Sequence, residues 1–135
     1  MDVININGSN DPYYRYKREK ILITNITNNR TRIDNIDKIG KDLNRTSNEI
    51  MKALSLLCNT SIVDSNCLKG TYNIDILEQN LTKYINDYIL CNHCNNPETI
   101  YIKQKDNLGK GCKACGKGFK ISKNSKLSRY ILKTL

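Results

Sequence analysis

The 135-residue sequence has no tryptophan, one histidine, one phenylalanine and two prolines. It contains no apolar run near the roughly 20 residues that a membrane-spanning helix needs, and residues 1–10 lack the basic start and apolar stretch of a secretory signal. We therefore expect a cytoplasmic protein without membrane association. The length excludes a large multidomain enzyme. His93, the only histidine, lies within a cysteine pair. No second histidine is available to act as a base for a cysteine nucleophile such as Cys58.

Acidic residues are also scarce, with 13 Asp and Glu against 22 Lys and Arg, which gives a net charge of +9. This balance favours polyanionic partners such as RNA or DNA, although a soluble surface that is merely basic has the same composition. The mean hydropathy is −0.57, yet 39% of the residues are hydrophobic, so a folded core is expected. Abundant Asn, Ile and Lys are typical of an A+T-rich genome of a parasite, protist or large DNA virus. If the source is a virus, the protein is expected in the cytoplasm of the host cell.

The first half of the chain has the periodicities of both strands and helices. β-Branched residues between 21 and 36 flank a polar, basic tip, as in a hairpin. Asn35 is expected to cap a short helix, Thr46 and Glu49 have the spacing of a capping box, and Asn73 or Asp75 is suited to cap a later helix. We therefore expect an α+β fold, a small antiparallel sheet with about three helices. The expected strands lie within 21–36, near 61–63 and near 71–74, and the expected helices follow residue 35, Thr46 and Asn73 or Asp75.

Paired cysteines mark a second module. Cys91-X-X-Cys94 and Cys112-X-X-Cys115, separated by 17 residues, have the spacing of a four-thiolate zinc ribbon, in which each pair forms a tight turn. Four protein ligands leave no open coordination position, so the sequence predicts a structural Zn²⁺. Disulfides or a redox C-X-X-C pair are the alternatives, and His93 is expected to be a surface residue.

The chain thus divides into four expected segments. They are a polar arm at 1–19, an α+β core at 20–90, a zinc ribbon at 91–122 and a C-terminal tail at 123–135, which is either helical or extended. Cys58 is expected to be a buried helix residue and Cys67 a free surface thiol. Lysines crowd the ribbon and are expected either to contact phosphates or to be ordinary solvated residues; they are Lys103, Lys105, Lys110, Lys113, Lys117 and Lys120.

Several runs resemble, in order, the N-terminal domain of eukaryotic translation initiation factor five. They are NDPYYRYK at 10–17, LNR at 43–45, CNHCNNPET at 91–99, CKACG at 112–116 and KLSRYILK at 126–133. The zinc motifs are partly shared with the beta subunit of initiation factor two, whereas the arm sequence is a feature of factor five. Members of that family usually continue into a C-terminal helical-repeat domain, so the resemblance implies the activator half alone, and we expect a monomer.

The resemblance implies a GTPase activator rather than an enzyme. The family stimulates GTP hydrolysis on the gamma subunit of initiation factor two, on the small ribosomal subunit that carries mRNA and initiator tRNA. Its arginine finger matches Arg15, and Tyr13, Tyr14 and Tyr16 are expected to anchor the arm that carries it. The family's RNA contacts match Asn29, Arg30 and Lys52. This sequence departs from the family at Arg18-Glu19, Thr46 and Ser125, and in its Asn-rich hairpin tip.

Two other functions fit part of the same evidence. A non-activating module that resembles the beta subunit would bind initiator tRNA or ribosomal RNA in the same place without stimulating hydrolysis. A zinc ribbon of the transcription machinery on an unrelated core would instead bind RNA polymerase. The arm sequence favours the activator over both.

Overall fold

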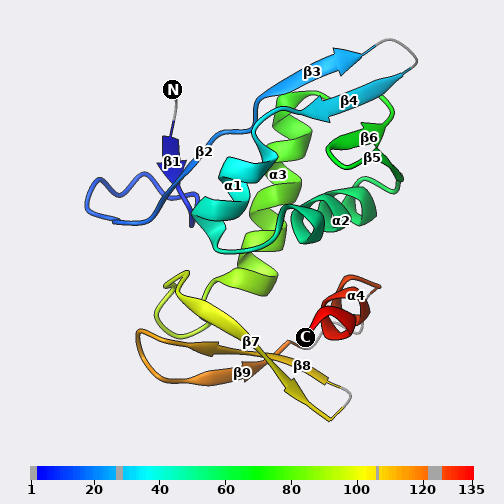
Figure 1. The fold of residues 1–135 in the computed structure, drawn as a ribbon. Helices are drawn as coiled ribbons and strands as arrows, with labels where there is room; N and C mark the ends of the chain where they lie inside the picture. Colours follow the sequence, from blue (N-terminus) through cyan, green and yellow to red (C-terminus); the bar gives the residue numbers. More distant parts are fainter. Residues whose placement is uncertain (1–2, 27–28, 106, 122–125) are drawn as a thin grey trace.

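The computed structural model describes residues 3–26, 29–105, 107–121 and 126–135. Three antiparallel sheets and a group of helices make an α+β fold, as the sequence predicts. In Figure 1 the β3–β4 hairpin lies at the top, the helices α1 to α3 in the middle and the sheet of the cysteine module at the bottom. None of the helices in these ranges has the length and apolar composition needed to cross a bilayer.

The N-terminal segment forms a hairpin in which β1 (Val3–Asn5) pairs with β2 (Lys17–Glu19). Arg18 in β2 is buried and forms a two-pronged ion pair with Glu78, with N–O distances of 2.8 and 3.1 Å. The same carboxylate accepts a hydrogen bond from the backbone N–H of Ile21 at 2.9 Å. The base of the expected arm is therefore attached to the core.

The main sheet has the strand order β3-β4-β6-β5. Its strands are β3 (Ile23–Ile26), β4 (Arg30–Ile33), β6 (Cys67–Lys69) and β5 (Ile62–Asp64). The expected strand near 71–74 is wrong: the strand is Cys67–Lys69, which pairs with both β4 and β5, and Ile74 already begins a helix. Cys67 is accordingly buried and is not the surface thiol that the sequence predicts.

Three helices pack on this sheet and enclose the core. They are α1 (Ile36–Leu43), α2 (Ser47–Leu57) and α3 (Ile74–Tyr84). Cys58, expected to be a buried helix residue, is instead half-buried and lies just after α2 as its C-cap. Two expected caps are confirmed, because Thr46 Oγ1 accepts from the Glu49 N–H at 3.2 Å and Asn73 Oδ1 accepts from the Ile76 N–H at 2.9 Å. The third is wrong, since the Asn35 side chain makes no cap hydrogen bond with α1 and accepts from the Leu22 N–H at 2.9 Å instead. A π-helical turn, η1 (Ile85–Ile89), continues α3 toward the cysteine module.

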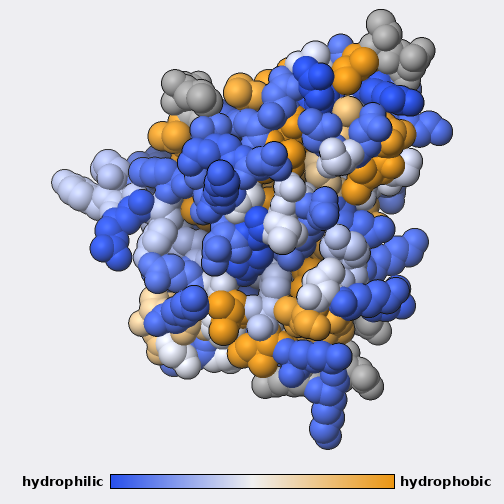
Figure 2. Space-filling model, viewed as in Figure 1, coloured by the Kyte–Doolittle hydropathy of each residue, from blue (hydrophilic) through white to orange (hydrophobic). Residues whose placement is uncertain are grey.

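The cysteine module is a three-stranded sheet of order β7-β8-β9. Its strands are β7 (Thr99–Gln104), β8 (Asn107–Cys112) and β9 (Gly118–Lys120). The tail is the helix α4 (Lys126–Thr134), so the helical alternative is the correct one. Its buried residues Leu127 and Ile131 join the hydrophobic cluster of the core. Figure 2 shows a face covered mostly by hydrophilic side chains, with hydrophobic ones scattered over the ribbon and the main sheet.

Candidate functional site

The four predicted cysteine ligands lie together. Two turns supply them, one between η1 and β7 and the other between β8 and β9. The Sγ atoms of Cys91 and Cys115 are 3.6 Å apart, as are those of Cys94 and Cys112, and all four lie within 4.8 Å of one another. A tetrahedron with Zn–S bonds of about 2.3 Å has sulfur–sulfur edges of about 3.8 Å, so the cluster has the size that Zn²⁺ requires.

The two turns have the same backbone pattern. The N–H of Asn95 donates to Cys91 O at 3.0 Å, and the N–H of Gly116 donates to Cys112 O at 2.9 Å. Both donors have left-handed backbones, with φ of 61° at Asn95 and 77° at Gly116. The shared geometry aims each cysteine pair at one point. The residues fit a structural Zn²⁺, which supplies cross-linking of the module when bound.

His93 lies outside this ligand set, as expected. Its side chain is exposed, and its Nδ1 lies 3.4 Å from Lys117 Nζ. The lysines nearby divide into two kinds. Lys103, Lys105, Lys113, Lys117 and Lys120 are exposed.

Lys110 is different, because it is only 2% exposed and its ammonium donates to the backbone oxygen of Asp87 at 3.4 Å. Burial lowers the pKa of Lys110, since desolvation opposes its charged form. The phosphate contact considered for Lys110 is therefore wrong. Its side chain packs between the ribbon and the end of the α3–η1 helix.

Arg15 lies on the loop that joins β1 to β2. The residue is exposed, and its guanidinium carbon lies 5.7 Å from the centroid of the Tyr16 ring. The Tyr14 hydroxyl donates to Asn95 O at 3.4 Å, and the Tyr16 hydroxyl donates to the Glu98 carboxylate. Partial burial raises the pKa of Tyr14 to about 12, with a further contribution from Tyr16. The loop thus lies against the first cysteine turn with Arg15 free at the surface.

Only two of the three expected tyrosine anchors contact this turn. Tyr13 is 89% exposed and its ring extends into solvent. Its backbone N–H donates to the carboxylate of Asp11 at 2.9 Å, which shapes the turn that begins at Asp11. Tyr13 is therefore part of the loop's turn, whereas Tyr14 and Tyr16 attach the loop to the ribbon.

The expected RNA-contacting residues fall on two elements. Asn29 and Arg30 meet at the β3–β4 turn, whereas Lys52 lies on α2 with its ammonium 6.0 Å from the Tyr130 ring. Asn29 has a φ of 59°, and its side chain accepts from the Thr71 hydroxyl at 2.7 Å. The guanidinium of Arg30 lies 3.6 Å from the carboxylate of Asp64. Each therefore has a contact within the domain.

A buried polar network joins the ribbon to the core, and sequence reasoning missed it. The Glu49 carboxylate accepts hydrogen bonds from the hydroxyls of Tyr84 and Tyr101, the latter at 2.7 Å. Arg45 stacks over the Tyr101 ring at 4.4 Å and donates to both oxygens of Thr99, at 3.0 and 3.2 Å. The only sequence signals were Arg45 in the LNR motif and Glu49 in the capping box.

Burial raises the pKa values of Tyr84 and Tyr101, because ionisation would place a second negative charge beside Glu49 away from water. Both hydroxyls therefore stay protonated and donate to the carboxylate. The network connects α2, the end of α3 and β7, and so determines how the ribbon sits on the core.

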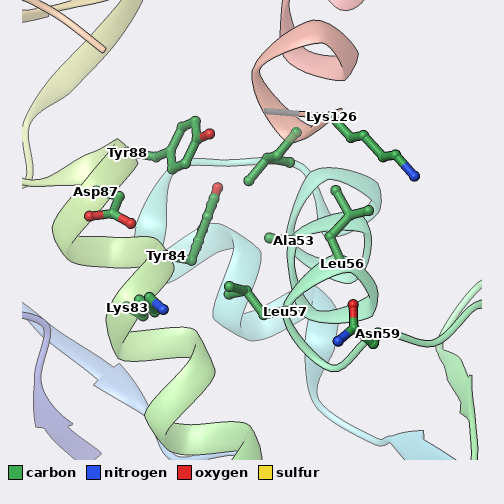
Figure 3. Close-up of a pocket in the computed structure, with 10 residues that line it drawn as sticks. Ala53, Leu56, Leu57, Asn59, Lys83, Tyr84, Asp87, Tyr88 and Lys126 are labelled. Atoms are coloured by element: carbon green, nitrogen blue, oxygen red, sulfur yellow. The ribbon is translucent and has the colours of Figure 1, made fainter. Parts of the chain in front are cut away.

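A pocket of about 390 Å³ lies between α2, the end of α3 and α4. Figure 3 shows Tyr84 and Tyr88 on one side of it and Leu56 and Leu57 on the other, with Lys126 at the α4 side. Its lining is mainly aliphatic and aromatic. None of the predicted site residues lines it, so it is separate from both the cysteine centre and the arginine loop.

Residues 7–118 match the model of a protein family described as a domain found in initiation factors 2B and 5. This match takes in the arginine loop, the α+β core and all four cysteines. The chain belongs to this initiation factor 2B/5 domain family. The resemblance found in the sequence is thereby confirmed.

Two groups of relatives share this initiation factor domain with the chain. The chain is 39% identical over 140 residues to eukaryotic translation initiation factor 5 of Saccharomyces cerevisiae, and 32% identical over 130 residues to that of Dictyostelium discoideum. These matches cover 96% and 91% of the chain but only 35% and 33% of the relatives, so the chain spans about a third of their length. The chain is also 29% identical to translation initiation factor 2 subunit beta of Methanosphaera stadtmanae, with 78% of each protein covered.

Proposed function

We propose that this initiation factor domain acts in translation initiation as a GTPase-activating protein, with Arg15 as an arginine finger supplied in trans. The observation that carries the proposal is the exposed Arg15 on the β1–β2 loop, with Tyr14 and Tyr16 on either side of it attached to the domain. A finger has to leave its own surface to enter another protein's nucleotide site. The relatives named translation initiation factor 5 support the role in translation initiation.

The chemistry of the guanidinium suits this role. During phosphoryl transfer negative charge is spread over the equatorial and leaving oxygens, and a planar fork of N–H donors neutralises it. Fingers of this kind accelerate hydrolysis by about 10³–10⁵, which corresponds to roughly 4–7 kcal/mol of transition-state stabilisation. The structural Zn²⁺ takes no part in this step and stabilises the fold of the zinc ribbon.

The partners follow from the resemblance. The target is the gamma subunit of initiation factor two with bound GTP, on the small ribosomal subunit with mRNA and initiator tRNA. Asn29 and Arg30 at the β3–β4 turn and Lys52 on α2 are the proposed RNA contacts. The net charge of +9 supports association with this RNA-rich assembly.

A single-turnover GTPase assay on reconstituted initiation complexes tests the role of Arg15. Arg15→Ala should lower the stimulated rate by about 10³-fold or more, while binding to the complex is kept. Arg15→Lys should remain strongly impaired, because an ammonium lacks the planar fork. The matched control is Arg129→Ala, which removes an exposed arginine from α4 and should leave the rate unchanged. Wild-type stimulation by Arg15→Ala would refute the proposal.

The second candidate is a non-activating RNA-binding module. The similarity of the chain to translation initiation factor 2 subunit beta supports it, at 29% identity over 111 residues. In that case the wild-type domain would not stimulate hydrolysis, yet would bind initiator tRNA or ribosomal RNA with a steep salt dependence. The same assay with a salt titration of RNA binding separates the two.

A further inference from the structure

We propose that the first cysteine turn and the residues that follow it, as far as Glu98, hold the arginine loop and so set the direction of Arg15. We call this contact surface the seat, and Tyr16 and Glu98 are its positioning residues. The orientation of the arginine would then depend on the integrity of the metal centre. The catalytic consequence rests on the proposed function. The seating of the loop itself is measurable without any GTPase.

The loop side of this contact consists of two tyrosine hydroxyls. Tyr16 donates to the Glu98 carboxylate and accepts from Asn96 Nδ2 at 3.2 Å, so its hydroxyl is held from two directions. Tyr14 donates to Asn95 O at 3.4 Å. The two rings pack edge to face, with centroids 5.8 Å apart. Two side chains therefore hold the residues on either side of Arg15.

The cysteine turns determine where the contacted groups lie. The N–H of Asn95 donates to Cys91 O at 3.0 Å, and the N–H of Cys91 donates to Asn96 O at 3.0 Å. Glu98 is reached from the second turn, because its backbone oxygen accepts from the N–H of Lys113 at 2.9 Å. A metal ion that clamps the four sulfurs thus also orders the three residues that receive Tyr14 and Tyr16.

The position of Arg15 between the two anchors explains its direction. Tyr14 and Tyr16 contact the ribbon through their hydroxyls, whereas the Arg15 side chain between them is exposed. The backbone is fixed next to Arg15 as well, because Tyr16 O accepts from the Ile6 N–H at 2.9 Å. The guanidinium carbon lies 5.7 Å from the centroid of the Tyr16 ring.

Amide hydrogen exchange of the zinc-loaded full chain tests the seat. Tyr16→Phe keeps the ring but removes the hydroxyl, and Glu98→Ala removes the acceptor. Each should speed exchange of the protected loop amides of Ile6 and Tyr14 by about fivefold, the loss of one ordinary hydrogen bond. Glu98→Gln keeps an acceptor oxygen and should restore slow exchange. Tyr13→Phe is the matched control and should change nothing, because that hydroxyl is in solvent.

The amide hydrogen exchange rates of β3 and β4 should be the same in all variants as in the wild type. Unchanged rates there show that the core is still folded. Chelation of the zinc should accelerate exchange in the loop at least as much as Tyr16→Phe does. Wild-type exchange in both Tyr16→Phe and Glu98→Ala would overturn the seat, and an unchanged loop after chelation would overturn its dependence on the metal.

The GTPase assay supplies the catalytic readout. Tyr16→Phe should lower the maximal stimulated rate by about fivefold without weakening binding, because the finger is less often in position. Glu98→Gln should recover the rate, which a loss of overall stability would not explain. A full maximal rate in Tyr16→Phe, with exchange accelerated, would overturn the positioning role. If the wild-type domain does not stimulate hydrolysis, the proposed function fails while the exchange experiment still decides the seat.

Discussion

The α+β core and the zinc ribbon are held together by different forces. The core has a large cluster of buried aliphatic and aromatic side chains. Among the described residues from 91 to 121, only Leu108 and Ile121 belong to that cluster. The ribbon instead has four clustered thiols inside it and the Glu49 network beneath it. The ribbon is too small to bury a core of its own, so it depends on metal ligation for its fold. Its position on the α+β core depends on the buried polar contacts.

Removal of a zinc ligand should have the largest effect on structure, and it should unfold the ribbon while the α+β core stays folded. Cys112→Ser deletes one thiolate, so zinc affinity and ribbon structure should be lost together, since structural zinc contributes about 10–16 kcal/mol in zinc-finger peptides. Native mass spectrometry and amide exchange should show a metal-free chain with an unprotected ribbon and a protected core. Cys58→Ser, which removes a half-buried thiol outside the cluster, should keep its zinc. A Cys112→Ser chain that holds zinc and an ordered ribbon would contradict this division.

Disruption of the polar network should have the next largest effect and should leave the ribbon folded. Glu49→Ala leaves two tyrosine hydroxyls without their acceptor and removes the carboxylate that lies 3.9 Å from Arg45 Nε. Loss of this buried charge should lower the free energy of unfolding by about 3–5 kcal/mol. Urea denaturation measures the loss, and zinc stoichiometry should stay at the wild-type value.

The matched control for Glu49 is Asp64→Ala, which breaks the exposed ion pair with Arg30 and should cost less than about 1 kcal/mol. Glu49→Gln should fall between the two, because the amide oxygen still accepts from a tyrosine. Equal effects of Glu49→Ala and Asp64→Ala would show that the network is not what holds the ribbon on the core.

Alkaline pH should weaken the same network more gently. Burial raises the folded-state pKa values of Tyr84 and Tyr101 above the ordinary 10.0, so above that pH the unfolded chain releases protons that the folded chain retains. The stabilisation is therefore complete below pH 10 and declines as pH rises, by up to about 1.4 kcal/mol per pH unit for each tyrosine. Urea midpoints measured on both sides of pH 10 should show a shallower decline for Tyr101→Phe than for the wild type. Equal slopes would exclude Tyr101 as a contributor.

Much of the local structure was predictable because it depends on neighbours in the chain. The caps at Thr46 and Asn73 satisfy N–H groups three residues away, and each C-X-X-C pair forms a turn within a few residues. The strand Cys67–Lys69 was missed because its short segment has no clear alternation. Its pairing with residues 30–32 and 62–64 is what makes it a strand.

The same division holds for the candidate site. The identity of the four zinc ligands followed from spacing alone, whereas the burial of Lys110 did not, since a lysine pattern does not reveal which side chain will be enclosed. The seat of the arginine loop joins residues about 80 positions apart, Tyr14 with Asn95 and Tyr16 with Glu98.

By itself, then, the amino-acid sequence determined most helix starts and the spacing of the four cysteines, while the family resemblance pointed to Arg15 as a candidate finger. The tertiary structure decided that the Glu49 carboxylate turns inward to two tyrosines and that Tyr14 and Tyr16 contact the residues around the first cysteine turn. The physical reason is range. Backbone capping and C-X-X-C turns are satisfied by near neighbours, whereas the partner of a buried charge or an anchoring hydroxyl is known only once distant segments have packed together.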